Sequence, residues 1–205
     1  MSTKKKGTVT VKNILAPGSN LKDRFIPSYF ELKQVVRDLK RMGYRVVLTQ
    51  GVYDMLHEGH ARYLEKALSY GDILVVGVDS DELTRKRKGP NRPVVPQNER
   101  LNMLAHLRSV GILTLREVNQ DIGALIKCIE PDVLITSAST KDFTRSEATA
   151  YKEWCGKVVV LPPQAATSTT ARVRLLTIGG ADQLAQEIMT AVPQIVANAL
   201  KKLRT

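Results

Sequence analysis

Two of the three histidines in the chain lie three positions apart, directly after an apolar run. In the stretch TQGVYDMLHEGH, residues 49–60, His57 and His60 flank Gly59. If a helix begins near His57, both rings lie on one face of its first turn. Unpaired amides and the helix dipole attract anions at that end. Gly51 and Gly59 leave space where a side chain would obstruct a bulky phosphate. The residue types and their spacing therefore predict a polyphosphate site.

The histidines have two other interpretations. A zinc site needs further ligands, and no third ligand follows at a suitable spacing. A pair of surface histidines that happens to cap a helix is the second alternative, and the position of the pair favours phosphate binding over it. The remaining histidine, His106, lies inside an expected helix without polar neighbours, so we interpret it as structural.

Two more segments have the composition of phosphate-binding segments. The basic segment TRKRKGPNR at 84–92 is expected to be a loop at the carboxyl end of a strand. The segment TSTTARVR at 167–174 offers hydroxyl and amide donors from Ser168, Thr169 and Thr170 at the start of another helix. Each segment alone is a weak signal, but all three are expected at the same edge of one sheet.

Apolar strand-like runs alternate with helical periodicity along the chain. The first expected helix begins at Ser28, which has the spacing of a capping box with Glu31, and ends near Met42. Strands are expected at 44–50, 72–78, 111–118, 131–137 and 157–162. Further helices are expected from 57 to about 71, at 97–108 with Pro96 as the first residue, at 121–129 and at 141–154.

Strands that are apolar on both faces and alternate with helices indicate a parallel sheet covered on both sides. We therefore predict an α/β fold with a doubly wound, five-stranded parallel sheet, in which ligands bind at the carboxyl ends of the strands. The expected organisation is a basic lead segment at 1–27, the α/β domain at 28–178 and a helical extension at 179–205.

The composition limits the class of protein and of partner. With 205 residues, 43% hydrophobic and 25% charged, the chain has the composition of a globular domain. We expect a cytoplasmic protein because no segment resembles a signal peptide or a bilayer span. Cys128 and Cys155 are too few for a disulfide framework and are expected to be buried free thiols. The net charge of +11 predicts an anionic partner: a nucleic acid, a membrane surface or a small phosphate compound.

The motif residues resemble those of the cytidylyltransferase-like nucleotidyltransferases, whose signature is G-x-F-D-x-x-H-x-G-H with a later S-T-T segment. The match covers about 28–175 and is most similar to the bacterial adenylyltransferase domain that activates heptose 1-phosphate. "VDSD" at 78–81 and "KGPNRPVVPQNERLNML" at 88–104 support it, and archaeal FAD synthetases are similar too.

This resemblance implies transfer of a nucleoside monophosphate to a small phosphorylated acceptor, with AMP from ATP favoured and pyrophosphate released. It assigns catalytic roles to His57, His60 and Lys88, and Mg²⁺ as the cofactor. The positions implied at the nucleotide are Gly51, Val52, Tyr53, Asp54, Gly59, Asp79, Arg92, Ser168, Thr169 and Thr170. Asp79 or Asp81, at the end of the second strand, is expected to contact the ribose or the metal ion, with a turn-forming role as an equal alternative. A homodimer is expected because dimers are frequent in the family.

Some features depart from the family pattern. Pro163 replaces an arginine that many cytidylyltransferases have before S-T-T. The segment "TSASTKD" at 136–142 replaces a Gly/Asp-rich turn, so the pocket wall that recognises the base or the acceptor is changed. A cytidylyltransferase and an FAD synthetase-like enzyme therefore stay open. A non-catalytic nucleotide- or RNA-binding protein is the alternative from another class. Against it, the chain lacks K-M-S-K-S, has no room for an anticodon-binding domain and has few aromatic residues for base stacking.

Overall fold

The computed structural model describes residues 9–16, 18, 20–138 and 149–164, together with single positions at 185, 188, 189, 192 and 193. The chain divides into two compact units, residues 1–166 and 167–205. The first unit contains the five described strands and the three histidines. The expected helical extension lies mostly outside the described residues.

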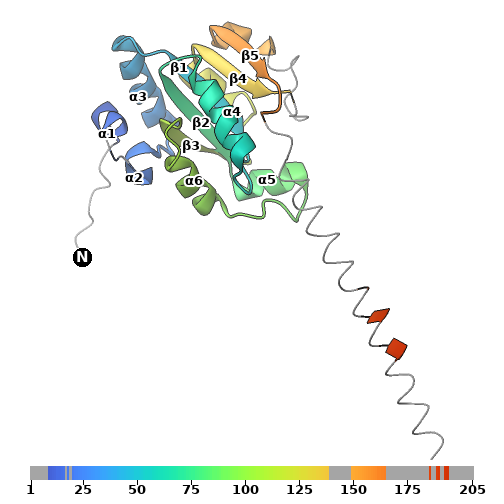
Figure 1. The fold of residues 1–205 in the computed structure, drawn as a ribbon. Helices are drawn as coiled ribbons and strands as arrows, with labels where there is room; N and C mark the ends of the chain where they lie inside the picture. Colours follow the sequence, from blue (N-terminus) through green and yellow to red (C-terminus); the bar gives the residue numbers. More distant parts are fainter. Residues whose placement is uncertain are drawn as a thin grey trace, which may run out of the picture. The chain divides into compact units, whose positions relative to one another are not determined.

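The first unit is built on five parallel strands in the order β3-β2-β1-β4-β5, which confirms the predicted fold class (Figure 1). The strands are β1 (Val46–Gly51), β2 (Ile73–Asp79), β3 (Ile112–Arg116), β4 (Val133–Ser137) and β5 (Lys157–Leu161). The chain runs outward from β1 through β2 to β3, then returns to pair β4 with the other side of β1. The strand order therefore reverses at β1, and the crevice at its carboxyl end is where such sheets bind ligands.

Helices cover both faces of the sheet. Alternate residues of each strand enter opposite cores: Val46 packs with α3 and α7, and Val47 packs with α4 and α6. The helices are α1 (Val11–Leu15), α2 (Leu21–Arg24), α3 (Tyr29–Arg41), α4 (Glu58–Leu68), α5 (Asp81–Lys88), α6 (Gln97–Ala105) and α7 (Ala124–Ile129), with a 3₁₀ turn at Lys152–Trp154. Within the described part of the chain, every helix is too short or too polar to cross a bilayer.

Helix caps explain why the expected start of one helix is confirmed and why an expected loop is instead a helix. Ser28 caps α3 as expected, because its Oγ accepts a hydrogen bond from the Glu31 amide at 3.4 Å. The expected basic loop at 84–92 is wrong over its first half, since residues 81–88 form α5. Ser80 is the N-cap of α5, and its Oγ accepts a hydrogen bond from the Leu83 amide at 3.2 Å. Acidic residues occupy the first turn and basic residues the last turn, so the charges at both ends of α5 stabilise the helix dipole.

Two smaller expectations about helices also change. Pro96 is the N-cap of α6 and not its first residue, and α6 ends at Ala105. Of the helix expected at 141–154, only residues 149–154 are described, and they include the 3₁₀ turn. Both cysteines are free, with Cys155 buried and Cys128 half-buried.

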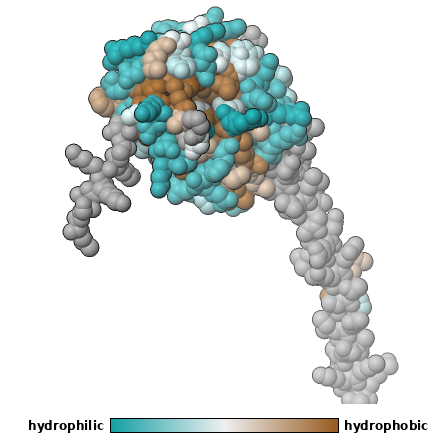
Figure 2. All heavy atoms as spheres, turned by 60° about the vertical axis from the view of Figure 1, so that its left-hand side comes forward, coloured by the Kyte–Doolittle hydropathy of each residue, from teal (hydrophilic) through white to brown (hydrophobic). Residues whose placement is uncertain are grey.

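The described part of the lead segment packs on the same core as the helices. Ile14 of α1 and Ile26 after α2 are buried, and Phe25 forms a parallel bridge with Leu113 of β3. Arg24 donates to the carbonyls of Ala105 (3.1 Å) and Val110 (3.0 Å). Figure 2 shows this side of the molecule, where apolar residues lie within a mainly hydrophilic surface.

Candidate active site

The two histidines meet at the start of α4, beyond the carboxyl end of β1. His57 is the N-cap of α4, and its Nδ1 accepts a hydrogen bond from the Gly59 amide at 3.1 Å. The ring of His60 stacks on that of His57, with 4.0 Å between ring centroids and 25° between planes. Because Nδ1 of His57 accepts, the proton of its neutral ring is on Nε2. The pair therefore presents a donor beside the positive end of a helix, as an anion site requires.

His60 is held in its neutral form. Burial, the neighbouring His57 and the ammonium of Lys88 lower the pKa of His60 to about 4, against the opposite effect of Asp54. Its Nδ1 is buried and has no hydrogen-bond partner among the described residues. An anion at this position would reverse the effect of the neighbouring positive charges and would satisfy a polar group that costs free energy when left unpaired.

The loop before His57 has an unusual backbone that places an aromatic ring behind the histidines. Tyr53 and Met55 have φ values of 54° and 48°, in the left-handed region that non-glycine residues rarely adopt. The Tyr53 ring is buried and meets His60 edge-on, with 5.6 Å between centroids. A Cβ on Gly51 would lie 3.3 Å from this ring. Gly51 therefore makes room for Tyr53, in addition to any approach of a ligand.

Asp54 and Arg92, both predicted to contact nucleotide, bind each other. The Asp54 carboxylate accepts from Arg92 Nη1 at 2.8 Å and from the amides of Val94 (3.1 Å) and Val95 (2.9 Å). Burial raises the pKa of the Asp54 carboxyl, but these hydrogen bonds outweigh it and leave the pKa below its ordinary value. The carboxylate thus fixes the 92–95 segment against the histidine loop, and a direct nucleotide contact stays a prediction.

Asp79 lies at the end of β2 with its side chain 1% exposed. Its Oδ1 accepts from Arg116 at 2.7 Å and its Oδ2 accepts from Arg87 at 2.8 Å. The turn-forming role that was the alternative for Asp79 belongs to the next residue, Ser80, which caps α5. The carboxylate neutralises two arginines beneath the site, and its contact with a ribose also stays a prediction.

Lys88 is the last residue of α5, and its charge acts on His60. The structure therefore brings three predicted catalytic residues, His57, His60 and Lys88, to the same edge of the sheet. Gly89 follows with a φ of 94°, which a glycine adopts at little cost and which ends the helix. Ser168, Thr169 and Thr170 lie outside the described residues. His106, interpreted as structural, is exposed at the end of α6 and contacts the Asn102 carbonyl at 2.8 Å.

Arg100 is a residue that the sequence analysis did not single out. It is 2% exposed and donates to carbonyls of three segments around the site. The signal was present in the sequence, since Arg100 stands beside Leu101 and one turn before Leu104 on an apolar helix face. A buried arginine in that place needs several acceptors.

Metal ligands do not gather in this part of the molecule. Among the described residues, no group of three or more histidine, cysteine or acidic side chains could hold a metal ion. The two buried carboxylates of the site, Asp54 and Asp79, already bind arginines.

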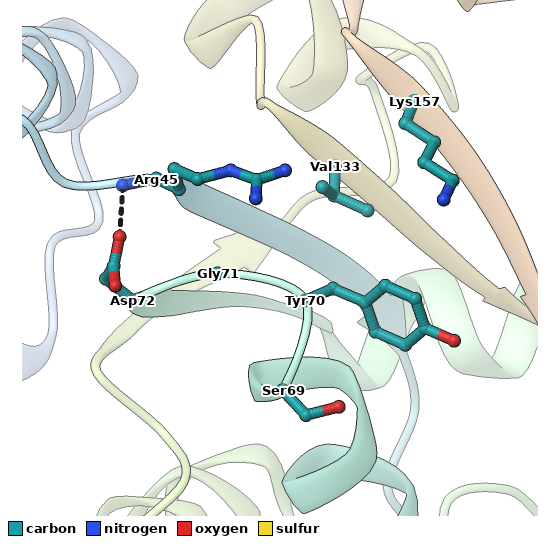
Figure 3. A pocket seen from close by; sticks show the side chains of 7 residues that line it. All are labelled: Arg45, Ser69, Tyr70, Gly71, Asp72, Val133 and Lys157. Atoms are coloured by element: carbon teal, nitrogen blue, oxygen red, sulfur yellow. Dashed lines mark hydrogen bonds between the residues drawn. The ribbon is translucent and has the colours of Figure 1, made fainter.

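A hollow lies at the opposite, amino edge of the sheet (Figure 3). It has a volume of about 400 Å³, and its lining includes Arg45 before β1, Asp72 before β2 and Lys157 at the start of β5. The Asp72 carboxylate accepts from the Arg45 amide at 2.7 Å, and Lys157 lies over the ring of Tyr70. These side chains belong to the turns that open the strands, and none of them is a predicted site residue.

Comparisons with known proteins agree with this geometry. The model of a family described as cytidylyltransferase-like matches residues 48–175. The bifunctional protein HldE of Desulfatibacillum aliphaticivorans is 35% identical over 140 residues, which are 68% of this chain and 28% of that protein. HldE of a Nitratiruptor species is 39% identical over 119 residues, 58% of this chain and 26% of that protein. The chain thus spans less than a third of these relatives.

Two solved structures share the fold. The lipopolysaccharide core biosynthesis protein of Thermoplasma volcanium GSS1 is 28% identical with a TM-score of 0.52, covering 60% of this chain and all of that one. The pantoate-beta-alanine ligase of Francisella tularensis, solved with beta-gamma ATP and beta-alanine, has a TM-score of 0.52 at 14% identity. It covers 69% of this chain and 67% of its own, and at that identity it supports the fold alone.

Proposed function

Because the chain belongs to the cytidylyltransferase-like family, we propose that it is a nucleotidyltransferase that joins a nucleoside monophosphate to a small phosphorylated acceptor. The observation that carries this proposal is the stacked pair of His57 and His60 at the start of α4, with the charge of Lys88 close enough to lower the pKa of His60. This arrangement offers donors and positive charge to a chain of phosphates.

The reaction needs no protein nucleophile. An oxygen of the acceptor phosphate attacks the α-phosphorus of the triphosphate in line, the bond to the bridging oxygen breaks, and pyrophosphate leaves with the electron pair. The Nε2–H of His57 and a ring N–H of His60 donate to phosphate oxygens, where they stabilise the charge that develops on the leaving side. Lys88 binds the acceptor or the triphosphate, and positioning supplies the rest of the acceleration.

We assign ATP, as the donor of AMP, and a sugar phosphate, as the acceptor, as the two substrates. The motif residues are most similar to the domain that activates heptose 1-phosphate, and the relatives named HldE and the lipopolysaccharide core biosynthesis protein support a sugar phosphate acceptor. Heptose 1-phosphate is therefore the first acceptor to test. The changed stretch at 136–142, which lies mostly outside the described residues, is the segment where this acceptor choice is most open to revision.

The nucleotide enters as its magnesium complex in this proposal. Mg²⁺ keeps several waters and commonly binds through phosphate oxygens with few protein ligands, and the carboxylates of Asp54 and Asp79 are already paired with arginines. The ion therefore accompanies the triphosphate as part of the substrate. Ser168, Thr169 and Thr170 are proposed to hold the β- and γ-phosphates. A homodimer stays a prediction.

The test combines binding with turnover. The melting temperature is first measured with ATP, CTP, GTP and UTP, each with Mg²⁺, because a ligand of the native state raises it without need of the acceptor. Pyrophosphate release is then measured with the selected nucleotide and heptose 1-phosphate, hexose 1-phosphates or a flavin phosphate. Selective stabilisation by ATP and release with a sugar phosphate support the proposal. Stabilisation by no nucleotide, together with salt-sensitive RNA binding, would replace it with the RNA-binding alternative.

A further inference from the structure

Arg100 lies in the first turns of α6 with its guanidinium fully buried. Its Nε donates to the Val95 carbonyl at 3.0 Å, and its Nη1 donates to the Val52 carbonyl. Its Nη2 donates to the Asp79 carbonyl and to the Asp81 carboxylate, both at 2.8 Å. One side chain thus satisfies four acceptors.

These acceptors belong to three segments that surround the histidines. Val52 stands between β1 and His57. Asp79 and Asp81 span the junction of β2 and α5, the helix that ends in Lys88. Val95 ends the segment that Asp54 fixes.

A neighbouring residue of α6 strengthens one of these links. The side-chain oxygen of Gln97 accepts from the Asp81 amide at 2.8 Å. The first turn of α6 therefore joins the loop that carries His57 to the helix that carries Lys88.

The chemistry of these contacts requires an arginine. The planar guanidinium has five N–H donors in a fixed fork, whereas the lysine ammonium donates from a single nitrogen and cannot reach acceptors on three separate segments. The charge is balanced by Asp81, whose side chain is 25% exposed. If the guanidinium is removed, the buried carbonyls of the three segments lose their donors. Because an unpaired buried carbonyl is costly, we expect the segments to move apart until water reaches these oxygens.

We propose that Arg100 is a positioning residue that sets the spacing between the His57–His60 pair and Lys88. It acts through the backbone of the three segments and does not touch the reacting phosphates. Its effect on turnover rests on the proposed function, whereas its effect on the geometry of the histidines does not.

The first test uses the histidines as reporters. The chain has three, so the ring protons of His57, His60 and His106 can be followed by NMR as the pH is changed. In Arg100→Lys and Arg100→Gln, the pKa of His60 should rise from about 4 toward its ordinary value of 6.5, since burial and the nearness of His57 and Lys88 lower it in the native site. The ring signals of His106, which lies at the exposed end of α6, should be the same as in the wild type.

Matched controls separate positioning from general destabilisation. Arg108→Lys and Arg108→Gln change an exposed arginine just beyond α6 and should leave all three titrations unchanged. Circular dichroism and a cooperative melt establish which variants are folded. If the Arg100 variants do not fold, Gln97→Ala and Asp81→Ala, which remove single links of the same junction, should move the His60 titration in the same direction by a smaller amount.

The second test is kinetic and keeps the two proposals distinct. At a temperature well below the melting transition, folded Arg100→Gln should lose about a hundredfold in kcat, with a smaller change in KM for the nucleotide. Arg100→Lys should recover only part of this loss. Folded variants with wild-type histidine titrations and wild-type kcat would overturn the positioning role. A shifted His60 titration in a protein with no turnover for any nucleotide supports positioning and contradicts the proposed transferase.

Discussion

The two edges of the sheet use aspartate in opposite ways. At the amino edge, Asp72 and Asp132 lie at the surface and accept backbone amides, from Arg45 and Val46 respectively, each at 2.7 Å. At the carboxyl edge, the side chains of Asp54 and Asp79 are 7% and 1% exposed, and each accepts from arginine. The same side chain therefore closes a turn at one edge and fixes cations at the other.

Burial explains the difference. Water screens the carboxylates of the amino edge, so they depend less on a cation, and the ion pair of Lys40 with Asp132 there is long at 4.0 Å. A buried carboxylate is costly unless it is paired and hydrogen-bonded. Because Asp54 and Asp79 bind Arg92, Arg87 and Arg116, these guanidiniums have fixed positions at the carboxyl edge. The carboxyl edge is thus held together by buried ion pairs, whereas the aspartates of the amino edge connect the starts of neighbouring strands.

The largest expected effect is on turnover at the carboxyl edge. His57→Ala and His60→Ala should each lower kcat by about a hundredfold or more, the usual result of losing one donor to a developing negative charge. His106→Ala, the matched change at the exposed end of α6, should leave kcat unchanged. Near-normal pyrophosphate release by both site variants would contradict the proposed mechanism.

Two aspartate substitutions, one at each edge of the sheet, compare the edges directly. Asp54→Asn removes the charge that balances Arg92 and should lower the free energy of unfolding by about 3 kcal/mol, with a further loss of turnover because the 92–95 segment is released. Asp72→Asn weakens one hydrogen bond at the surface and should cost about 1 kcal/mol, with unchanged turnover. Urea unfolding and steady-state kinetics measure both, and equal effects on turnover would remove the contrast between the edges.

A glycine at the amino edge tests whether stability and activity separate. A Cβ on Gly71 would lie 2.7 Å from the Arg45 carbonyl oxygen and 2.7 Å from Val47 Cγ2. Gly71→Ala should therefore lower the free energy of unfolding by about 1–3 kcal/mol while kcat, measured below the melting transition, stays at the wild-type value. A drop in kcat in the folded variant would show that the amino edge influences the site.

The smallest expected effect is a proton linkage at His60. Its native pKa of about 4 lies below its ordinary value of 6.5, so the unfolded chain binds more protons between these values. The contribution of His60 to stability is therefore complete above pH 6.5 and is lost as the pH falls toward 4. A bound triphosphate should raise the pKa of His60, so binding in this window should take up protons. Calorimetry in buffers of different ionisation enthalpy measures this uptake, and His60→Gln, compared with the wild type, should show less of it.

Local sequence patterns predicted helices and strands well where the residues of one segment satisfy the hydrogen-bonding groups of that same segment. The alternation of apolar residues predicted five strands, and Ser28 with Glu31 predicted the start of α3. The spacing of His57 and His60 predicted their common face. The helix at 81–88 was missed although Ser80 precedes two acidic residues, because the run of basic residues that follows was interpreted as a solvated loop.

The sequence by itself determined the parallel sheet, the edge at which the histidines gather and the family to which the chain belongs. Only the tertiary structure decided that Asp54 binds Arg92, that Asp79 binds Arg116 and that Arg100 joins three segments. These partners are far apart in the chain and meet because parallel pairing brings the ends of β1, β2 and β3 together. Hydrophobic periodicity and caps depend on neighbours within a few residues, whereas the pairing of a buried charge depends on which strands become adjacent.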